Sequence, residues 1–282
     1  MIDFGSYFTY FFRLTLMITY LNFITEGAVS LQTIAIATQK GGTGKTTTAQ
    51  ALGIGLSLKG YQILFIDLDP QGNLSYILGA SQQNVTAYEM LTGKIAMRKV
   101  ICKIDKKVSI IASSPLLSGI DPELKKTDKE FLLKKNLEAI KAEYDYLIID
   151  SPPSLGILTV NALAASNHVI IPAQADIFSL QGIGQLYSTV ETVKKYCNPN
   201  LAIKGILLTR YNNRSILSRD LTDLIKETAQ KLDTFVYQTV IRESITIKEA
   251  QASKKDIFSY APRNNVTKDY SKFIEEYLNI KE

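Results

Sequence analysis

The chain has 282 residues, of which 46% are hydrophobic and 21% charged, and its formal net charge at pH 7 is +5. This composition excludes a disordered chain and favours one large globular domain. With only two cysteines, Cys102 and Cys197, and one histidine, His168, a disulfide framework or a cysteine–histidine metal site is not supported. We therefore expect a protein of a reducing compartment whose chemistry uses carboxylates, lysines and hydroxyls.

Residues 1–31 differ from the rest of the chain because they are rich in aromatic and aliphatic side chains. Arg13 divides them into apolar stretches shorter than the ~20 residues of a membrane-spanning helix, which argues against stable membrane insertion. A signal peptide also fits poorly, because its positive charge would precede the apolar stretch. We expect residues 1–31 to be an extension outside the domain at 32–282, with a native start near Val29 or Leu31.

From Gln32 onward, short β-branched runs alternate with longer amphipathic segments, which predicts an α/β fold with one mostly parallel, twisted sheet and helices on both faces. In chain order, the expected strands are Thr33–Ala37, Gln62–Asp67, Val108–Ala112, Tyr146–Asp150, His168–Pro172, Ala202–Thr209 and Phe235–Val240. Apolar residues at three- and four-residue spacing predict the helices. These are Lys45–Leu58, Lys129–Glu143, Gly156–Ala165, Leu180–Tyr196, Ser218–Leu232 and Asp269–Leu278.

The strongest chemical signal is the sequence KGGTGKTT at residues 40–47, here called the phosphate loop, between the first expected strand and the first expected helix. Glycines let backbone amides turn toward phosphate oxygens, and the helix N-terminus adds a positive dipole end. Lys45 is expected to reach the β- and γ-phosphates of a nucleotide, and the Thr46 hydroxyl to ligate Mg²⁺. Gln39 stands where the usual pattern has glycine, so the loop fits a deviant form. The expected nucleotide contacts are Lys40, Gly41, Gly42, Thr43, Gly44, Lys45, Thr46 and Thr47.

Three aspartates follow expected strands. Asp67 and Asp69 lie two positions apart at the end of one expected strand, and we do not expect both to aim at a phosphate in the same way. Asp69, which precedes Pro70, is the better candidate for positioning water. Asp150 ends another strand and so reaches the same carboxyl edge of the sheet as the phosphate loop. Because a buried aspartate needs a cation or several donors, Asp150 is expected to hold Mg²⁺ through water.

Three motifs in this order resemble the ParA/Soj family of deviant Walker A ATPases: KGGTGKTTT at residues 40–48, IDLDPQGN at 66–73 and IIDSPP at 148–153. The resemblance runs from about Gln32 to near the C-terminus and includes GILLTRY at 205–211. It implies a cytoplasmic ATPase with ATP and Mg²⁺ as cofactors. Its slow hydrolysis of ATP to ADP and phosphate would be accelerated by a partner.

The same resemblance implies roles for individual residues. Lys40 would be the signature lysine, which reaches across a two-fold interface to the phosphates bound by the partner subunit and so couples ATP to dimerisation. Asp69 would be the catalytic carboxylate, acting with Lys40 and Lys45. Asp67 would support the site and sense the nucleotide state, unless it merely caps local backbone. The implied metal ligands are Thr46, Asp69 and Asp150.

The resemblance also implies partners: a second copy in an ATP-dependent homodimer, non-specific DNA of the nucleoid, and a ParB-like centromere-binding protein, with a plasmid or chromosome as cargo. An excess of basic over acidic residues in 203–263 permits a polyanion-binding face there. Soj-like chains carry proline and arginine where this chain has Arg242-Glu243, and a basic residue at Thr246, so we expect a rearranged face. The candidate DNA contacts are Arg214, Arg242, Lys248, Lys254 and Lys255.

Three other functions remain open. A MinD-like ATPase, which cycles on a membrane or positions proteins, would end in a basic amphipathic anchor, whereas residues 270–282 hold three glutamates and two lysines. An electron-transfer reductase of the nitrogenase iron-protein kind would need cysteine ligands, and Cys102 and Cys197 do not fall at that family's positions. A non-enzymatic nucleotide-gated scaffold would lack hydrolysis, and the intact lysine and aspartates of the site argue against it.

Overall fold

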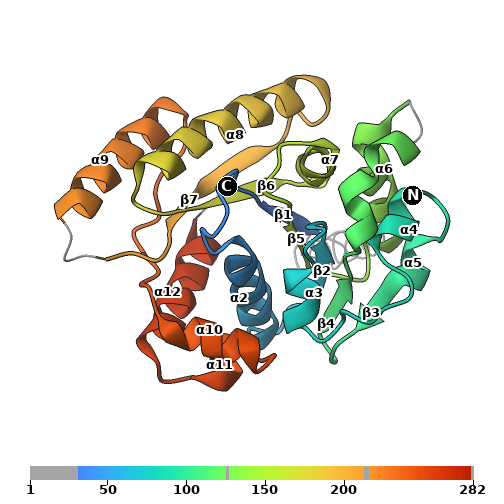
Figure 1. The fold of residues 1–282 in the computed structure, drawn as a ribbon, viewed down its shortest axis with the longest axis horizontal. Helices are drawn as coiled ribbons and strands as arrows, with labels where there is room; N and C mark the ends of the chain where they lie inside the picture. The colour runs from blue at the N-terminus through green and yellow to red at the C-terminus, as the bar shows by residue number, and fades with distance from the viewer. Residues whose placement is uncertain (1–30, 125–126, 213–215, 281–282) are drawn as a thin grey trace, which may run out of the picture. The chain divides into compact units, whose positions relative to one another are not determined.

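The computed structural model of the protein describes residues 31–124, 127–212 and 216–280. Within these residues, the unit that begins at Gln32 is built around a seven-stranded sheet (Figure 1). Its order is β3-β4-β2-β5-β1-β6-β7, and all neighbours are parallel except β3 and β4. The predicted α/β fold with a mostly parallel sheet is confirmed. The strands are β1 (Gln32–Ile36), β2 (Ile63–Asp67), β3 (Ile101–Lys103), β4 (Val108–Ile111), β5 (Tyr146–Asp150), β6 (His168–Ala173) and β7 (Ala202–Leu208).

The central strands are buried along their whole length. Strands β2 and β5 read ILFID and YLIID, and every residue in them is buried. Such continuous apolar runs are typical of a parallel sheet that is covered on both faces. The pairing register places Asp67, the last residue of β2, beside Asp150, the last residue of β5, which in turn lies beside Ile36 of β1. The carboxyl ends of three strands therefore meet at one edge of the sheet.

Helices cover both faces of this sheet (Figure 1). Helices α2 (Lys45–Leu58) and α12 (Asn265–Asn279) pack together on one face, and α7 (Ile157–Ala165) and α8 (Ile177–Tyr196) pack together on the other. The shorter or more peripheral helices are α3 (Asn73–Ile77), α4 (Ala87–Leu91), α5 (Met97–Val100), α6 (Leu132–Leu137), α9 (Ile216–Lys231), α10 (Ile245–Ala252) and α11 (Ile257–Tyr260). Single 3₁₀ turns lie at Pro115–Gly119, Asp121–Glu123, Lys129–Phe131 and Glu138–Ile140.

The strand predicted at Phe235–Val240 is wrong. This segment forms only an isolated bridge, between Val236 and Ile206. Its neighbour β7 is irregular at Gly205, where φ is 117° and a Cβ would lie 2.7 Å from the ring of Tyr237. The pairing of β7 with β6 also shifts its register between Val169 and Ile171, and the segment 235–240 meets β7 at one bridge without continuous pairing.

The helix predicted at Lys129–Glu143 is broken into α6 and two flanking 3₁₀ turns. Its predicted apolar face is nonetheless buried, at Leu133, Leu137 and Ile140. The sequence did not reveal β3, α3, α4, α5 or α11, because elements of three to five residues are too short to show a period. The eight-residue α10 was also missed.

Within the ranges given above, no helix combines the length and apolar character that crossing a bilayer requires. We predicted an N-terminal extension at residues 1–31. Residues 1–30 lie outside the described part of the chain, so this stays a prediction.

Gly53 in α2 tests the packing of that helix on the sheet, and Gly184 in α8 serves as its control. A Cβ on Gly53 would lie 2.2 Å from the ring of Phe65, which is fully buried in β2. Gly53→Ala should therefore lower the free energy of unfolding by about 1–3 kcal/mol, because overpacking outweighs the gain in helix propensity. In α8, a Cβ on Gly184 would meet nothing within 4 Å. Gly184→Ala should therefore raise the free energy of unfolding by about 0.5–1 kcal/mol. Urea denaturation measures both, and equal effects would contradict the tight packing at Gly53.

Candidate functional site

The phosphate loop lies between β1 and α2, and hydrogen bonds from other segments of the chain fix its conformation. Gly42 and Gly44 have φ angles of 77° and 78°, a left-handed conformation that favours glycine. The Thr209 hydroxyl donates to the Thr43 carbonyl at 2.6 Å, and the Gln174 side-chain amide donates to the Gly42 carbonyl at 2.9 Å. These bonds tie the loop to the ends of β6 and β7.

Lys45, the first residue of α2, lies between two carboxylates. Its Nζ is 3.2 Å from Asp150 Oδ1 and 3.4 Å from Asp69 Oδ2, and all three side chains are buried. Thr46 Oγ1 donates to the other oxygen of Asp150 at 2.7 Å. Burial alone would lower the pKa of Lys45, but the two carboxylates raise it above its ordinary value. The site therefore holds a fixed positive charge at the edge of the sheet.

Asp67 is bonded to the start of α3 rather than to the phosphate loop. Its Oδ2 accepts from the amide and the hydroxyl of Ser75 at 2.8 and 2.7 Å, and its Oδ1 accepts from the amide of Asp69 at 3.2 Å. Burial, and after it the charge of Asp150, raises the pKa of Asp67 to about 7 in spite of these bonds. The contacts match the alternative role of a local backbone cap.

Asp69 stands just beyond β2, with both oxygens occupied. Its Oδ1 accepts from the amide of Gln71 at 3.0 Å, while its Oδ2 faces Lys45. A cavity of about 440 Å³ opens beside it and is also lined by Leu117 and Pro152. The carboxylate is thus fixed in orientation and adjoins space that can hold water.

A second cavity, of about 510 Å³, adjoins the phosphate loop on the side of α10. Its lining includes Tyr76, Arg210 and Ile247, and within that lining Gln251 Nε2 donates to Thr47 Oγ1 at 3.0 Å. Isoleucine and tyrosine side chains line it together with charged groups, so the cavity offers both apolar and polar contacts to a small molecule. Sequence reasoning did not bring Tyr76, Arg210, Ile247 or Gln251 to the loop, because they are distant from it in the chain; Thr47 and Gln251, for example, are 204 positions apart.

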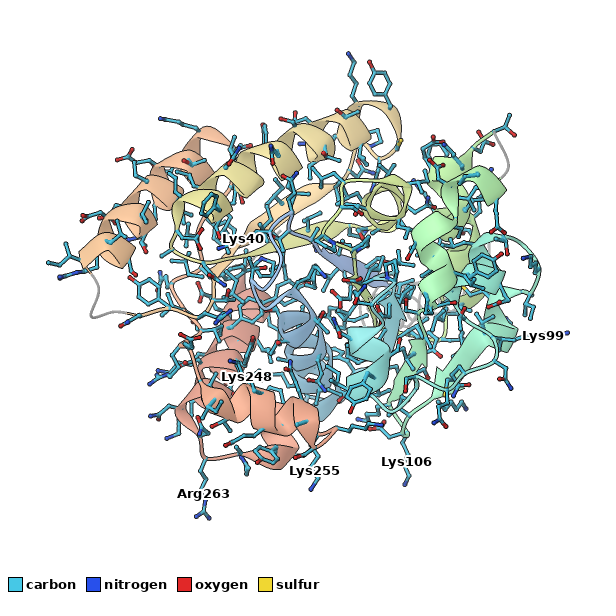
Figure 2. The ribbon with its side chains drawn as sticks, in the orientation of Figure 1. Lys40, Lys99, Lys106, Lys248, Lys255 and Arg263 are labelled. Carbon is cyan, nitrogen blue, oxygen red and sulfur yellow. The ribbon has the colours of Figure 1, made fainter. Side chains whose placement is uncertain are left out.

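Lys40, labelled in Figure 2, is bonded to residues of its own chain. Its ammonium forms an ion pair with Asp176, the N-cap residue of α8, and donates to Gln174 Oε1 at 3.3 Å. Both side chains of the pair are partly exposed. The two lysines of the loop therefore have different partners: Lys45 binds the aspartates at the sheet edge, and Lys40 binds the start of α8.

The oxygen atoms around Lys45 suit Mg²⁺. The Thr46 hydroxyl and the carboxylates of Asp69 and Asp150 are hard oxygen donors, which Mg²⁺ prefers. Among the described residues, no group of three or more His, Cys, Asp or Glu side chains is placed to hold a metal. Mg²⁺ commonly binds one or two carboxylates together with substrate phosphates and water, so these residues fit the ion as a partner of a bound nucleotide.

Two of the predicted DNA contacts are engaged within the protein. Arg242 donates from Nε and Nη2 to the two oxygens of Asp269, at 2.6 and 2.8 Å. Lys254 Nζ lies 4.5 Å above the ring of Tyr76. Arg242 thus pairs within the C-terminal segment, and Lys254 connects that segment with α3.

The other predicted DNA contacts differ in position. Arg214 lies outside the described residues. Lys248 on α10 and Lys255 just beyond it are exposed (Figure 2). Arg263, which sequence reasoning missed, is exposed and points outward near Lys255 in the same view.

Comparisons with known proteins point to one family. A family model described as an AAA domain matches residues 31–203. The sporulation initiation inhibitor protein Soj of Bacillus subtilis is 39% identical to this chain, covering 86% of it and 96% of Soj. The chromosome partitioning protein ParA of Caulobacter vibrioides is 38% identical, covering 88% of this chain and 94% of that protein.

Solved structures share the fold. A variant of McdA from Cyanothece in complex with ATP has a TM-score of 0.79 and 27% identity, covering 90% of this chain and 99% of that one. A Mycobacterium smegmatis protein named cobyrinic acid a,c-diamide synthase, solved with an ATP analogue and magnesium, has a TM-score of 0.75 and 30% identity. That match covers 87% of this chain and 93% of the other.

Removing the charge of Lys45 tests whether the site needs a cation. Lys45→Ala should lower the free energy of unfolding by roughly 2–4 kcal/mol, because Asp69 and Asp150 lose their counter-charge and proton uptake offsets only part of the loss. Mg²⁺ without nucleotide should recover part of the stability, since it binds the same oxygens. Urea unfolding with and without Mg²⁺ measures both effects.

The control for this experiment is Lys248→Ala, which removes an exposed lysine and should change the free energy of unfolding by less than about 0.5 kcal/mol. If the Lys45→Ala protein is as stable as the parent, the two carboxylates do not need the ammonium and the electrostatic account of the site is wrong.

Proposed function

Because the chain belongs to the ParA/Soj family of P-loop ATPases, with ATP and Mg²⁺ as its cofactors, we propose that it is an ATP-driven partition switch. Mg·ATP joins two protomers into a dimer that binds DNA without sequence preference. A ParB-like partner accelerates the slow hydrolysis, the dimer separates, and plasmid or chromosome cargo moves over the nucleoid. The observation that carries this proposal is Lys45, held between Asp69 and Asp150 where the phosphate loop meets the sheet.

In this proposal the triphosphate lies in the phosphate loop, and the base and ribose lie in the 510 Å³ cavity. The loop amides and Lys45 bind the phosphates, helped by the dipole of α2. Tyr76 and Ile247 supply apolar walls for the base, and Arg210 stands at the loop, where its guanidinium donates to the Gly42 carbonyl at 3.3 Å. Nucleotide binding would thereby connect α10 with the start of α2.

Hydrolysis on this site needs an in-line water and charge neutralisation rather than covalent chemistry. Asp69 positions the water, because its orientation is fixed and it adjoins the 440 Å³ cavity. Thr46, Asp69 and Asp150 would hold Mg²⁺, which when bound would supply charge neutralisation at the phosphates. Lys45 adds positive charge from the same protomer, and Lys40 adds it from the partner protomer.

The position of the apolar side of helix α12 bears on whether this helix could bind a membrane. The apolar side of α12 is buried, including Tyr270, Phe273 and Tyr277, and the ring of Phe273 contacts that of Tyr237 at a centroid distance of 4.9 Å. A membrane-binding amphipathic helix needs its apolar side for lipid. This helix uses that side to complete the core, so α12 itself is not available to bind lipid.

The proposal predicts DNA binding that depends on ATP. Protein starting at Leu31 should bind non-specific duplex DNA with ATP but not with ADP or without nucleotide. Raising the salt concentration should weaken binding, because phosphate contacts release counterions. Fluorescence anisotropy with labelled DNA at two salt concentrations measures both effects.

Three variants separate the steps of this cycle. Lys45→Ala should abolish DNA binding, Lys40→Ala should bind ATP but not DNA, and Asp69→Ala should bind DNA persistently because hydrolysis is blocked. An intact nucleotide site without DNA binding under any condition would contradict the partition switch and favour a membrane-cycling or protein-positioning ATPase.

A charge reversal tests the position of the DNA-binding face. Lys255→Glu should lower affinity for any DNA sequence about tenfold and should make binding less dependent on salt, because a phosphate contact is lost. Lys99→Glu is the matched control, since Lys99 is an exposed lysine on α5, far from Lys255 in Figure 2. The same anisotropy assay measures both, and equal losses of affinity in the two variants would show that net charge, rather than this face, determines binding.

A further inference from the structure

We propose that Asp176 and Gln174 are positioning residues for Lys40, which hold its ammonium within its own chain and so oppose ATP-dependent dimerisation until Lys40 changes partner. The inference rests on the proposed function, in which Lys40 reaches the phosphates of the partner protomer. One ammonium cannot serve both positions at once. The contacts of Lys40 within its own protomer therefore compete with those that it makes across the dimer.

The holding contacts are specific. The ammonium of Lys40 pairs with Asp176 Oδ2 and donates to Gln174 Oε1 at 3.3 Å. The amide end of Gln174 is bound to the phosphate loop, through the Gly42 carbonyl at 2.9 Å. The two partners of Lys40 thus connect it both to α8 and to the loop from which it extends.

These partners are themselves fixed by the first turn of α8. Asp176 uses its other oxygen, Oδ1, to accept from the amide of Ser179 at 2.8 Å, and the Ser179 hydroxyl accepts from the amide of Gln174 at 3.1 Å. A Cβ on Gly182 would lie 3.9 Å from the backbone nitrogen of Lys40, so the same helix packs against the backbone of the loop. Asp176 and Gln174 therefore present oxygens whose positions do not depend on Lys40.

The strength of the pair suits an exchange of partners. Partial burial alone would raise the pKa of Asp176, but its bonds with Lys40 and with the Ser179 amide lower it below its ordinary value, so the carboxylate is charged. The side chains of Lys40 and Asp176 are 25% and 30% exposed. Ion pairs that water can reach stabilise only modestly. Such a pair can be exchanged for phosphate contacts, unlike a buried one.

The surface next to the pair suits a second copy of the chain. Ile177 and Phe178 directly follow Asp176, and they are 56% and 68% exposed. Large apolar side chains exposed together are typical of protein contacts. Covering them with a second protomer would bring that protomer to the corner where Lys40 is held.

The experiment uses a variant that removes the charge of Asp176 and keeps its other function. Asp176→Asn retains a side-chain oxygen for the N-cap of α8. Asp176→Glu restores the charge and should return toward the parent. Asp128→Asn is the matched control, because it removes one negative charge from an exposed ion pair with Lys135, and Asn tolerates the φ of 60° at that position.

Two quantities are measured for each protein. Where nucleotide is needed, a non-hydrolysable ATP analogue replaces ATP so that no hydrolysis occurs. The first is the acylation rate of Lys40 by an amine-reactive ester without nucleotide, read by mass spectrometry against Lys255. It should rise about two- to five-fold in Asp176→Asn, as expected for the loss of a partly exposed ion pair. The second is the dissociation constant of the analogue-bound dimer by analytical ultracentrifugation. Both protomers must release Lys40 before the dimer forms. The dissociation constant of the dimer should therefore fall by the square of the two- to five-fold change in labelling rate, which is about four- to twenty-five-fold.

The outcomes separate this inference from the proposed function. If the parent dimerises with the analogue but the labelling rate or the dimer constant is the same in Asp176→Asn, Asp176 does not restrain Lys40 and the inference is wrong while the proposed function stands. If the parent forms no dimer with any nucleotide, the proposed function fails and the restraint fails with it. A similar change in Asp128→Asn would assign the effect to net charge and would also overturn the inference.

Discussion

The register between β2 and β5 brings the last residues of the two strands, Asp67 and Asp150, side by side in the protein interior. Two buried carboxylates on neighbouring strands each make the negative charge of the other less favourable. The fold resolves the conflict by giving them different partners: Asp67 binds Ser75 at the start of α3, and Asp150 binds Lys45 and the Thr46 hydroxyl. A cation at Asp150 is therefore an electrostatic requirement of the sheet as well as a feature of the phosphate site.

The two lysines of the phosphate loop show how burial sets the use of a charge. Lys45 is buried between Asp69 and Asp150, where removal of one partner leaves uncompensated charge, so this contact is suited to a permanent role. Lys40 and Asp176 are partly exposed, so water screens their attraction. The loop thus carries one lysine whose partners are buried and one whose partner water can reach.

Much of the fold and of the phosphate site could be predicted, because both follow from local sequence. The strands β2 and β5 are continuous apolar runs, and the carboxyl ends of parallel strands necessarily meet at one edge, so the amino-acid sequence alone is enough to bring Asp150 to the phosphate loop. The ion pair of Lys40 with Asp176 and the contact of Gln251 with Thr47 could not be predicted, because they depend on single side chains at the start of α8 and on α10, whose positions the rule for parallel strands does not fix. The strand predicted at Phe235–Val240 was wrong because the composition of this segment is that of a strand, whereas the fold pairs it with β7 only at the bridge between Val236 and Ile206.

The surface charge of the C-terminal region shows a similar limit of composition. Arg242 pairs with Asp269, and Arg210 pairs with Glu243 at 2.7 Å. Two arginines that count toward a basic surface in the sequence are thus matched by carboxylates in the fold. The resemblance in sequence leads us to expect arginine at position 243, where this chain has Glu243, the partner of Arg210. Lys248 on α10 and Lys255 beyond it remain exposed in the fold. The count of basic residues in 203–263 therefore overstates the charge that this surface can offer to a polyanion, because carboxylates within the fold already pair with part of it.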